Sequence, residues 1–228
     1  MSDGVYNPLD KLNLAKSIEA KLLAAVAAPL ATAGGIQGAG VYVIYYAGDF
    51  VAYAPISKAN ESGNFTQPIY IGKAIPKGGR KGGISADVAK SRALGDRLGQ
   101  HATSVAQAGN LDLAHFFVRH LVVDDIWIPL GENMLIETFK PLWNRAIDGF
   151  GNKDPGMRRS TQYKSPWDVL HPGRAFSDKL ANGPMTITFL LQRVSDYLAA
   201  RPLAKLPQAI SDQIAAQKRE AEDSADET

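Results

Sequence analysis

Aliphatic residues recur at helical spacing near the start of the chain. The residues that follow this spacing are Leu9, Leu12, Leu14, Ile18, Leu22, Leu23 and Val26. Residues three or four positions apart lie on the same face of a helix. The pattern therefore predicts an amphipathic helix over residues 8–30, which Pro29 and the Gly34–Gly35 pair would end.

Two later segments lack this spacing and indicate strands. Residues 41–46 are apolar or aromatic without alternation, which predicts a strand covered on both faces. Residues 68–72 predict a second short strand, and residues 50–54 are either a further short strand or an excursion of the chain. The strands at 41–46 and 68–72 are most simply antiparallel neighbours, and this pairing would allow Tyr42 and Tyr70 to share one face of a sheet.

The rest of the chain predicts further helices and one more strand. Apolar positions indicate a helix over 86–107, and β-branched and aromatic residues indicate a strand over 113–123. A helix is expected between 129 and 147, where Pro141 should end or kink it. Two final helices are expected near 184–200 and 207–218, followed by a charged end that we expect to be disordered.

Charge is unevenly distributed, although the net charge is only +2. The segment Lys73–Arg97 holds seven basic and two acidic residues, whereas Lys218–Thr228 holds two basic and five acidic residues. The chain has no cysteine, which excludes disulfides, thiolate metal sites and a cysteine nucleophile. No apolar run approaches the roughly 18 residues that span a membrane. We therefore expect a cytoplasmic protein without a membrane partner.

Short motifs coincide with the two predicted strands: Gly-Val-Tyr at 40–42 and Tyr-Ile-Gly at 70–72. Downstream, Arg97 and His101 are four residues apart in the sequence LGDRLGQH, and Glu132 and Asn144 are twelve apart in ENMLIETFKPLWN. Together and in this order, these residues resemble the motifs of the GIY-YIG nuclease superfamily.

Within that superfamily the chain is similar to the type II restriction endonucleases that cut the palindrome CCGCGG. The segments that carry this resemblance are QGAGVY, PIYIGKA, NLDL, KPLWN, DGFGN and HPGR, from Gln37 to Arg174. The resemblance implies an α/β (α+β) fold with a small three-stranded antiparallel sheet flanked by helices and with N- and C-terminal helical extensions. Its parts would be an N-terminal extension (1–35), a nuclease core (36–150), a DNA-binding or dimer extension (151–206), and a helix with an acidic tail (207–228).

The resemblance also implies roles for the motif residues. Glu132 would provide a carboxylate for Mg²⁺, with Mn²⁺ as a substitute, and Arg97 would present its guanidinium to phosphate oxygens. Tyr42 would act as base toward water or orient it, with His101 as the acceptor of the phenol proton. Tyr70 would hydrogen-bond the water or the phosphate, and Asn144 would hold the architecture of the site.

Each of these residues also has an ordinary structural interpretation. Tyrosines in strands are usually packing residues with a hydrogen-bonded tip, and we interpret Tyr45 and Tyr46 in this way. Glu132 could be favoured by the dipole at a helix N-terminus, and Arg97 with His101 could form a solvated helix face. The functional interpretation depends on the joint occurrence of all the motifs.

A nuclease that reads CCGCGG needs basic side chains near the guanines of each half-site. The candidates for DNA contact are Lys73, Arg80, Lys81, Arg92, Arg158, Arg159 and Arg174. The implied partners are double-stranded DNA, a second copy of the chain on a palindromic site, and a cognate DNA methyltransferase in the same bacterial system. Two alternatives stay open: a GIY-YIG nuclease of repair or homing, and a sequence-specific DNA-binding protein that has lost catalysis.

Overall fold

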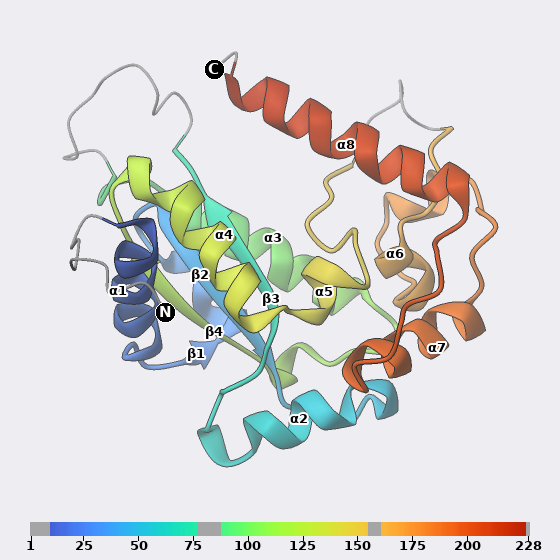
Figure 1. Ribbon diagram of the computed structural model, residues 1–228, viewed down its shortest axis with the longest axis horizontal. Coiled ribbons are helices and arrows are strands. Elements are labelled where there is room, and N and C mark those ends of the chain that lie inside the picture. Colours follow the sequence, from blue (N-terminus) through green and yellow to red (C-terminus); the bar gives the residue numbers. More distant parts are fainter. Residues whose placement is uncertain (1–9, 77–87, 155–160, 227–228) are drawn as a thin grey trace, which may run out of the picture.

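The computed structural model describes residues 10–76, 88–154 and 161–226. At its centre lies an antiparallel sheet with the strand order β1-β4-β2-β3 (Figure 1). The strands are β1 (Ala28–Pro29), β2 (Gly40–Tyr46), β3 (Pro68–Ala74) and β4 (Phe116–Val122). The three longer strands confirm the predicted small antiparallel sheet. The short strand β1 makes it four-stranded rather than three-stranded.

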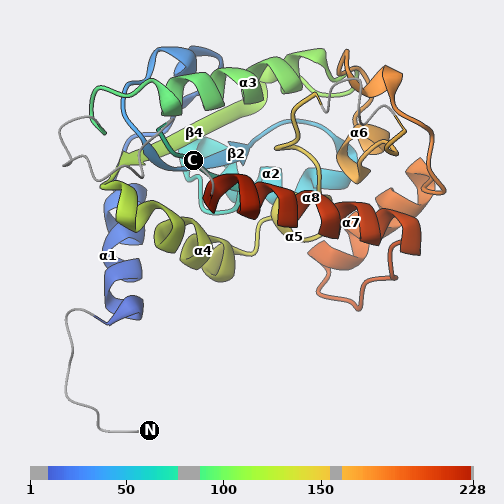
Figure 2. The ribbon, with the colours of Figure 1, turned by 90° about the horizontal axis from the view of Figure 1, so that it is seen from above.

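Helices cover both faces of this sheet, and Figure 2 shows them as layers above and below the strands. α3 (Ala93–Gln107) packs on the face formed by the even-numbered residues of β2. α1 (Lys11–Leu23) and α4 (Ile128–Phe139) pack on the face formed by its odd-numbered residues. Every residue of β2 is buried, which is why its sequence shows no alternation of apolar and polar positions.

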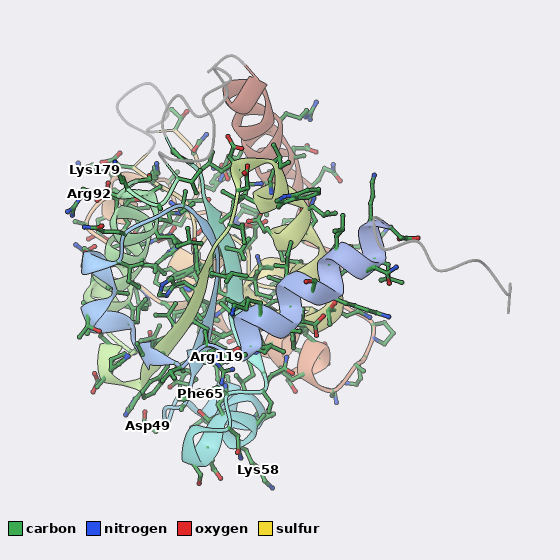
Figure 3. All side chains as sticks on the ribbon, turned by 90° about the vertical axis from the view of Figure 1, so that its left-hand side faces the viewer. Asp49, Lys58, Phe65, Arg92, Arg119 and Lys179 are labelled. Atoms are coloured by element: carbon green, nitrogen blue, oxygen red, sulfur yellow. The ribbon has the colours of Figure 1, made fainter. Side chains whose placement is uncertain are left out.

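Tyr45 lies on the odd-numbered face of β2, away from the predicted catalytic residues. Arg119 of β4 donates to the Tyr45 hydroxyl at 3.0 Å and to the carbonyl oxygen of Phe65 at 3.0 Å. Arg119 and Phe65 lie side by side in Figure 3. The structural interpretation of Tyr45 is therefore confirmed. Tyr46, on the other face, packs on Phe116 at a ring distance of 4.9 Å and accepts a backbone hydrogen bond from Phe50.

The predicted N-terminal helix is too long. α1 begins after Asp10, whose side chain accepts from the Leu12 amide, and it ends at Leu23. Residues before a proline favour extended backbone, and proline is tolerated on an edge strand. Ala28 and Pro29 accordingly pair with β4 as β1, and a 3₁₀ segment, Leu30–Gly35, follows.

The region 50–60 contains no strand. A 3₁₀ turn at Val51–Tyr53 leads into α2 (Ala54–Asn60). Pro55 lies in the first turn of α2, where its missing N–H costs no helical hydrogen bond. The excursion interpretation of 50–54 is therefore confirmed and the strand alternative is wrong.

The predicted helix at 86–107 is confirmed as α3, which begins at Ala93. The predicted strand at 113–123 begins with a 3₁₀ turn, Leu113–His115, before β4. Pro141 separates α4 from the short helix α5 (Leu142–Arg145), as its missing N–H predicts. Further 3₁₀ turns are Glu61–Gly63, Asp125–Trp127 and Ser177–Lys179.

The C-terminal part of the chain contains α6 (Pro166–Leu170), α7 (Ile187–Leu198) and α8 (Gln208–Asp226). It joins the hydrophobic cluster on the α3 side of the sheet, where α7 contacts α5, α6 and the 3₁₀ turn at Val51–Tyr53. Trp167, Leu190 and Ile210 are buried in the hydrophobic cluster that also contains Tyr42. α8 continues past residue 218 to Asp226, so the helix is longer than the sequence predicts. The boundaries of the four predicted units stay a prediction.

Candidate active site

A cleft of about 1330 Å³ opens between α3, the end of β3, α4 and the segment 151–154. It is lined by four of the six predicted catalytic residues, Tyr42, Tyr70, Arg97 and Glu132, and by two of the predicted DNA contacts, Lys73 and Arg92. Tyr42 lies at the floor of the cleft and has no solvent-exposed surface. The fold therefore brings residues that are up to 90 positions apart in the sequence to one concave surface.

Two glycines of the motifs allow the strands to approach closely. Tyr42 of β2 lies opposite Gly72 of β3. A Cβ atom on Gly72 would collide with the Tyr42 hydroxyl and lie 2.6 Å from the ring carbon that carries it. A Cβ atom on Gly40 would collide with the carbonyl group of Leu121 on β4. The final glycine of the Tyr-Ile-Gly motif thus makes room for the tyrosine of the Gly-Val-Tyr motif.

Tyr42 and His101 are joined by a hydrogen bond of 2.7 Å between the tyrosine oxygen and Nε2. Burial raises the pKa of Tyr42 well above its ordinary value, and ionisation of the neighbouring Tyr70 would raise it further. Burial lowers the pKa of His101 well below its ordinary value, with contributions from Arg97 and Arg174. Both groups are therefore neutral near pH 7. The Tyr42 oxygen also accepts from the Arg97 guanidinium, so the hydroxyl proton is directed to His101 and Nε2 accepts it.

Arg97 lies one helical turn before His101 and faces the two tyrosines. Its Nη2 donates to the carbonyl oxygen of Gly151 at 2.9 Å, and Nη1 donates to Gln100 at 3.4 Å. The guanidinium also contacts the hydroxyls of Tyr42 and Tyr70. In a buried site a charge-assisted contact of this kind is stronger than in water. Arg97 thus places a positive charge inside the cleft, beside the two tyrosine hydroxyls.

Glu132 lies in the second turn of α4 and is half-buried in the cleft. Lys73, the residue after the Tyr-Ile-Gly motif, approaches it at 2.8 Å from Nζ to Oε2. Among the described residues no group of three or more His, Asp or Glu side chains could hold a metal ion. A single accessible carboxylate fits a hard divalent cation whose other ligands are water and phosphate oxygens. Glu132 therefore fits the predicted metal-binding role, with Lys73 as a competitor for its carboxylate.

Asn144 lies in α5 and binds the backbone of β3. Its Oδ1 accepts from the Ile71 amide and its Nδ2 donates to the Ile71 carbonyl, both at 2.8 Å. Ile71 stands between Tyr70 and Gly72, so these two bonds fix the strand at the motif itself. This geometry agrees with the architectural role that the sequence implies.

Six of the seven predicted DNA contacts fall into three groups. Arg92, labelled in Figure 3, lines the cleft; its side chain is 72% exposed and pairs with Asp96 at 3.5 Å. Lys73 lines the cleft beside Glu132. The candidates Arg80, Lys81, Arg158 and Arg159 lie outside the described residues.

The prediction that Arg174 contacts DNA is wrong for this structure. Its side chain is 1% exposed and pairs with the equally buried Asp168 at 2.7 Å. The remaining guanidinium donors bind backbone carbonyl groups of residues 149, 150 and 152. A basic residue in the sequence indicates positive charge but not its burial, and Arg174 carries its charge in the interior.

Sequence reasoning missed two residues that contact the predicted catalytic set. Phe150 stacks on the His101 ring, with centroids 4.5 Å apart and planes at 16°. The carbonyl oxygen of Gly151 accepts from Arg97. Both belong to the DGFGN segment, which the resemblance singles out without a role. The resemblance of this segment to the family could therefore have indicated Phe150 and Gly151.

The fold and the cleft are those of a small α/β nuclease module with the GIY-YIG arrangement of motifs. The family model of the Eco29kI GIY-YIG domain matches residues 35–198. The chain therefore belongs to this family of GIY-YIG restriction endonuclease domains, which confirms the resemblance at the level of the restriction enzyme branch. No curated protein matches the chain significantly.

Proposed function

We propose that the chain is a type II restriction endonuclease that hydrolyses double-stranded DNA at the palindrome CCGCGG. The observation that carries the proposal is the hydrogen-bonded Tyr42–His101 pair beside Arg97, in a cleft that also contains the Glu132 carboxylate. The match to the Eco29kI GIY-YIG domain supports a restriction enzyme rather than a repair or homing nuclease. The presence of all the predicted catalytic residue types argues against an inactive DNA-binding protein.

Phosphodiester hydrolysis requires a base for water and stabilisation of the charge that develops on the phosphoryl oxygens. As water attacks, Tyr42 takes a proton from it and passes its own proton to Nε2 of His101 through the existing hydrogen bond. Because the two transfers occur together, no free phenolate has to form beside an imidazolium in the buried site. Tyr42 has no exposed surface in the free protein. The Arg97 guanidinium contacts this hydroxyl, so the attacking water must enter beside Arg97, where the phosphate would bind.

Other residues of the cleft would assist this step. Tyr70 orients the water or a phosphate oxygen, and Arg97 stabilises the phosphoryl charge. Glu132 would hold Mg²⁺, or Mn²⁺ as a substitute, and such an ion would act as a Lewis acid that stabilises the developing negative charge. Lys73 is placed to meet a phosphate oxygen once its ion pair with Glu132 opens.

The proposed target implies an assembly and a biological setting. A palindrome that is cut on both strands is matched by a two-fold symmetric homodimer on DNA. The enzyme would act in the bacterial cytoplasm with a cognate DNA methyltransferase, a functional rather than physical partner, that protects the host genome. No helix in the described ranges is long and apolar enough to cross a bilayer.

Digestion of DNA tests the proposal. A linear duplex with one CCGCGG site should yield two discrete fragments in Mg²⁺ and none in EDTA. A duplex with one altered base pair in the site serves as the matched control and should stay intact. Failure to obtain discrete fragments from site-containing DNA, across several salt concentrations, would contradict the proposed function.

A further inference from the structure

Arg174 is enclosed on every side by groups that fix its guanidinium. Nε donates to Asp168 at 2.7 Å, Nη2 donates to the Gly149 carbonyl at 2.9 Å, and Nη1 donates to the Phe150 carbonyl at 3.0 Å. A longer contact of 3.4 Å joins Nη1 to the carbonyl oxygen of residue 152. The planar group lies against the rings of Trp167 at 4.5 Å and Phe176 at 4.7 Å. Such a fork of donors holds a backbone segment in one conformation.

The carboxylate that pairs with Arg174 is itself fixed. Ser165 caps α6 and donates from Oγ to the second carboxylate oxygen of Asp168 at 2.7 Å, while it accepts from the Asp168 amide at 3.2 Å. A buried ion pair is maintained only when hydrogen bonds satisfy both partners. Asp168 and Arg174 satisfy this condition, so the guanidinium has little freedom to move.

The segment 149–152, which Arg174 holds from one side, contacts the predicted catalytic residues on its other side. The Gly151 carbonyl accepts from Nη2 of Arg97 at 2.9 Å. The Phe150 ring stacks on His101 and contacts Tyr70 at a centroid distance of 5.0 Å. A Cβ atom on Gly151 would lie 2.9 Å from the Tyr70 hydroxyl and 3.0 Å from Nη2 of Arg97. Segment 149–152 thus links Arg174 to three residues of the site, Arg97, His101 and Tyr70.

We propose that Arg174 is a positioning residue for DNA cleavage: through segment 149–152 it sets the placement of Arg97 and His101. The proposal deepens the proposed nuclease function and rests on it for the effect on cleavage. It gives the C-terminal part of the chain a defined contribution to the active site. The family match is consistent with this, because it continues through Arg174 to residue 198.

The charge of Arg174 has a second consequence for His101. His101 faces Tyr42 from β2, Tyr70 from β3, and Arg97 from its own helix. Burial is the main cause of its lowered pKa, and the charges of Arg97 and then Arg174 lower the pKa further. Removal of the Arg174 charge should therefore raise the pKa of His101, and the acidic limb of the pH–rate profile should move to higher pH.

Two substitutions in the C-terminal part separate positioning from general stability. Arg174→Lys keeps the charge and loses the fork of donors. Arg193→Lys is the matched control, because Arg193 also donates to backbone carbonyls, of Ala146 at 2.8 Å and Ala204 at 2.5 Å, but contacts none of the predicted catalytic residues. Circular dichroism and thermal melting establish that each variant is folded.

We expect Arg174→Lys to cleave about 10- to 100-fold more slowly in single-turnover reactions at saturating enzyme, as small displacements of catalytic groups do. Binding to the same duplex in Ca²⁺ should change by less than about threefold, and Arg193→Lys should cleave within about threefold of the unsubstituted protein. Unchanged cleavage by folded Arg174→Lys overturns the proposal. An equal loss in Arg193→Lys also overturns it.

An imidazole titration followed by NMR tests the proposal without cleavage. The chain has only four histidines, so the His101 signal can be assigned with His101→Gln. The His101 pKa should be higher in Arg174→Met than in the unsubstituted protein, and near its original value in Arg174→Lys. An unchanged pKa in Arg174→Met contradicts the placement of Arg174. If Arg174→Met does not fold, the NMR chemical shift of the His101 ring in Arg174→Lys decides. A changed chemical shift supports the proposal, and an unchanged one contradicts it. Failure of the proposed nuclease function would leave this result standing.

Discussion

Lys73 and Glu132 form an ion pair, with 2.8 Å between Nζ and Oε2, at the wall of the cleft that contains Tyr42. Lys73 directly follows the Tyr-Ile-Gly motif on β3, and Glu132 lies in α4 on the neighbouring helix layer. In the free protein the Lys73 ammonium group is therefore paired with the carboxylate that the proposed function assigns to a divalent cation. Under the proposed function, metal binding to Glu132 would release Lys73 and make its charge available to the phosphate.

The first prediction concerns this competition. Lys73→Met removes the ammonium group, so the Glu132 carboxylate should bind Mn²⁺ several-fold more tightly in the absence of DNA. Calorimetric or electron paramagnetic resonance titration measures the dissociation constant. Lys58→Met is the control, because Lys58 is exposed on α2 at a distance from the cleft (Figure 3). Unchanged or weaker Mn²⁺ binding by Lys73→Met would show that the ion pair does not compete with the metal.

Glu132→Ala should abolish cleavage but not DNA binding. Loss of groups around metal ligands costs 10- to 100-fold in activity, so loss of the ligand itself should cost at least about 100-fold. Single-turnover cleavage and fluorescence anisotropy on the same duplex separate the two effects. Glu137→Ala, on the same helix but paired with Arg145, serves as the control. Cleavage by Glu132→Ala at a rate similar to that of the unsubstituted protein would remove Glu132 from the metal site.

Gly72→Ala should reduce both stability and cleavage. The added methyl group collides with the Tyr42 ring, and overpacking of this kind costs about 1–3 kcal/mol. Urea unfolding measures the free energy, and single-turnover cleavage measures the displacement of Tyr42. Gly35→Ala is the matched control because its Cβ atom would meet nothing within 4 Å. Full activity and stability of Gly72→Ala would contradict the close approach of the two strands.

Acid should destabilise the protein through His171. Its Nε2 accepts from the Tyr53 hydroxyl at 2.5 Å and its Nδ1 donates to Asn110 at 2.9 Å, a network that requires the neutral ring. Burial, assisted by the charge of Arg174, lowers the His171 pKa to about 3, whereas the unfolded chain has a histidine pKa of about 6.5. The unfolded state therefore binds more protons between these values, so the stability that neutral His171 provides is lost as pH falls from about 6.5 to 3.

Urea unfolding between pH 7 and pH 4 measures this loss for the unsubstituted protein and for His171→Gln. We expect the stability of His171→Gln to be lower at pH 7 and to fall less steeply as the pH decreases. Equal slopes for the two proteins would show that another group controls acid unfolding.

Much of the sheet and the predicted catalytic residues of the site can be recognised in the sequence. Uninterrupted apolar residues in β2 predict a strand buried on both faces, because both faces are covered by helices. The resemblance to the GIY-YIG motifs implies that Tyr42, Arg97, His101 and Glu132 share one site, and they line or contact one cleft. These features could be predicted because each depends on residue type and on spacing along the chain.

Features that depend on tertiary contacts were not predictable. The helix predicted over 8–30 ends at Leu23, since pairing of Ala28 and Pro29 with β4 overrides the apolar pattern. Arg174 resembles any exposed arginine in the sequence, and only the folded chain shows its pairing with Asp168. The ion pair of Lys73 with Glu132 likewise joins residues whose separation in the sequence carries no signal of contact.

The proposed chemistry depends on the hydroxyl of Tyr42, which lies 2.7 Å from Nε2 of His101. Tyr42→Phe removes this oxygen and keeps the ring, and Tyr45→Phe removes the hydroxyl that Arg119 binds on the opposite face of β2. We expect Tyr42→Phe to lower the single-turnover rate on a CCGCGG duplex by about 100-fold or more, within the range for loss of a general base. Tyr45→Phe should cleave at nearly the unsubstituted rate. A folded Tyr42→Phe protein that cleaves as fast as the unsubstituted enzyme would contradict the role of Tyr42 in catalysis.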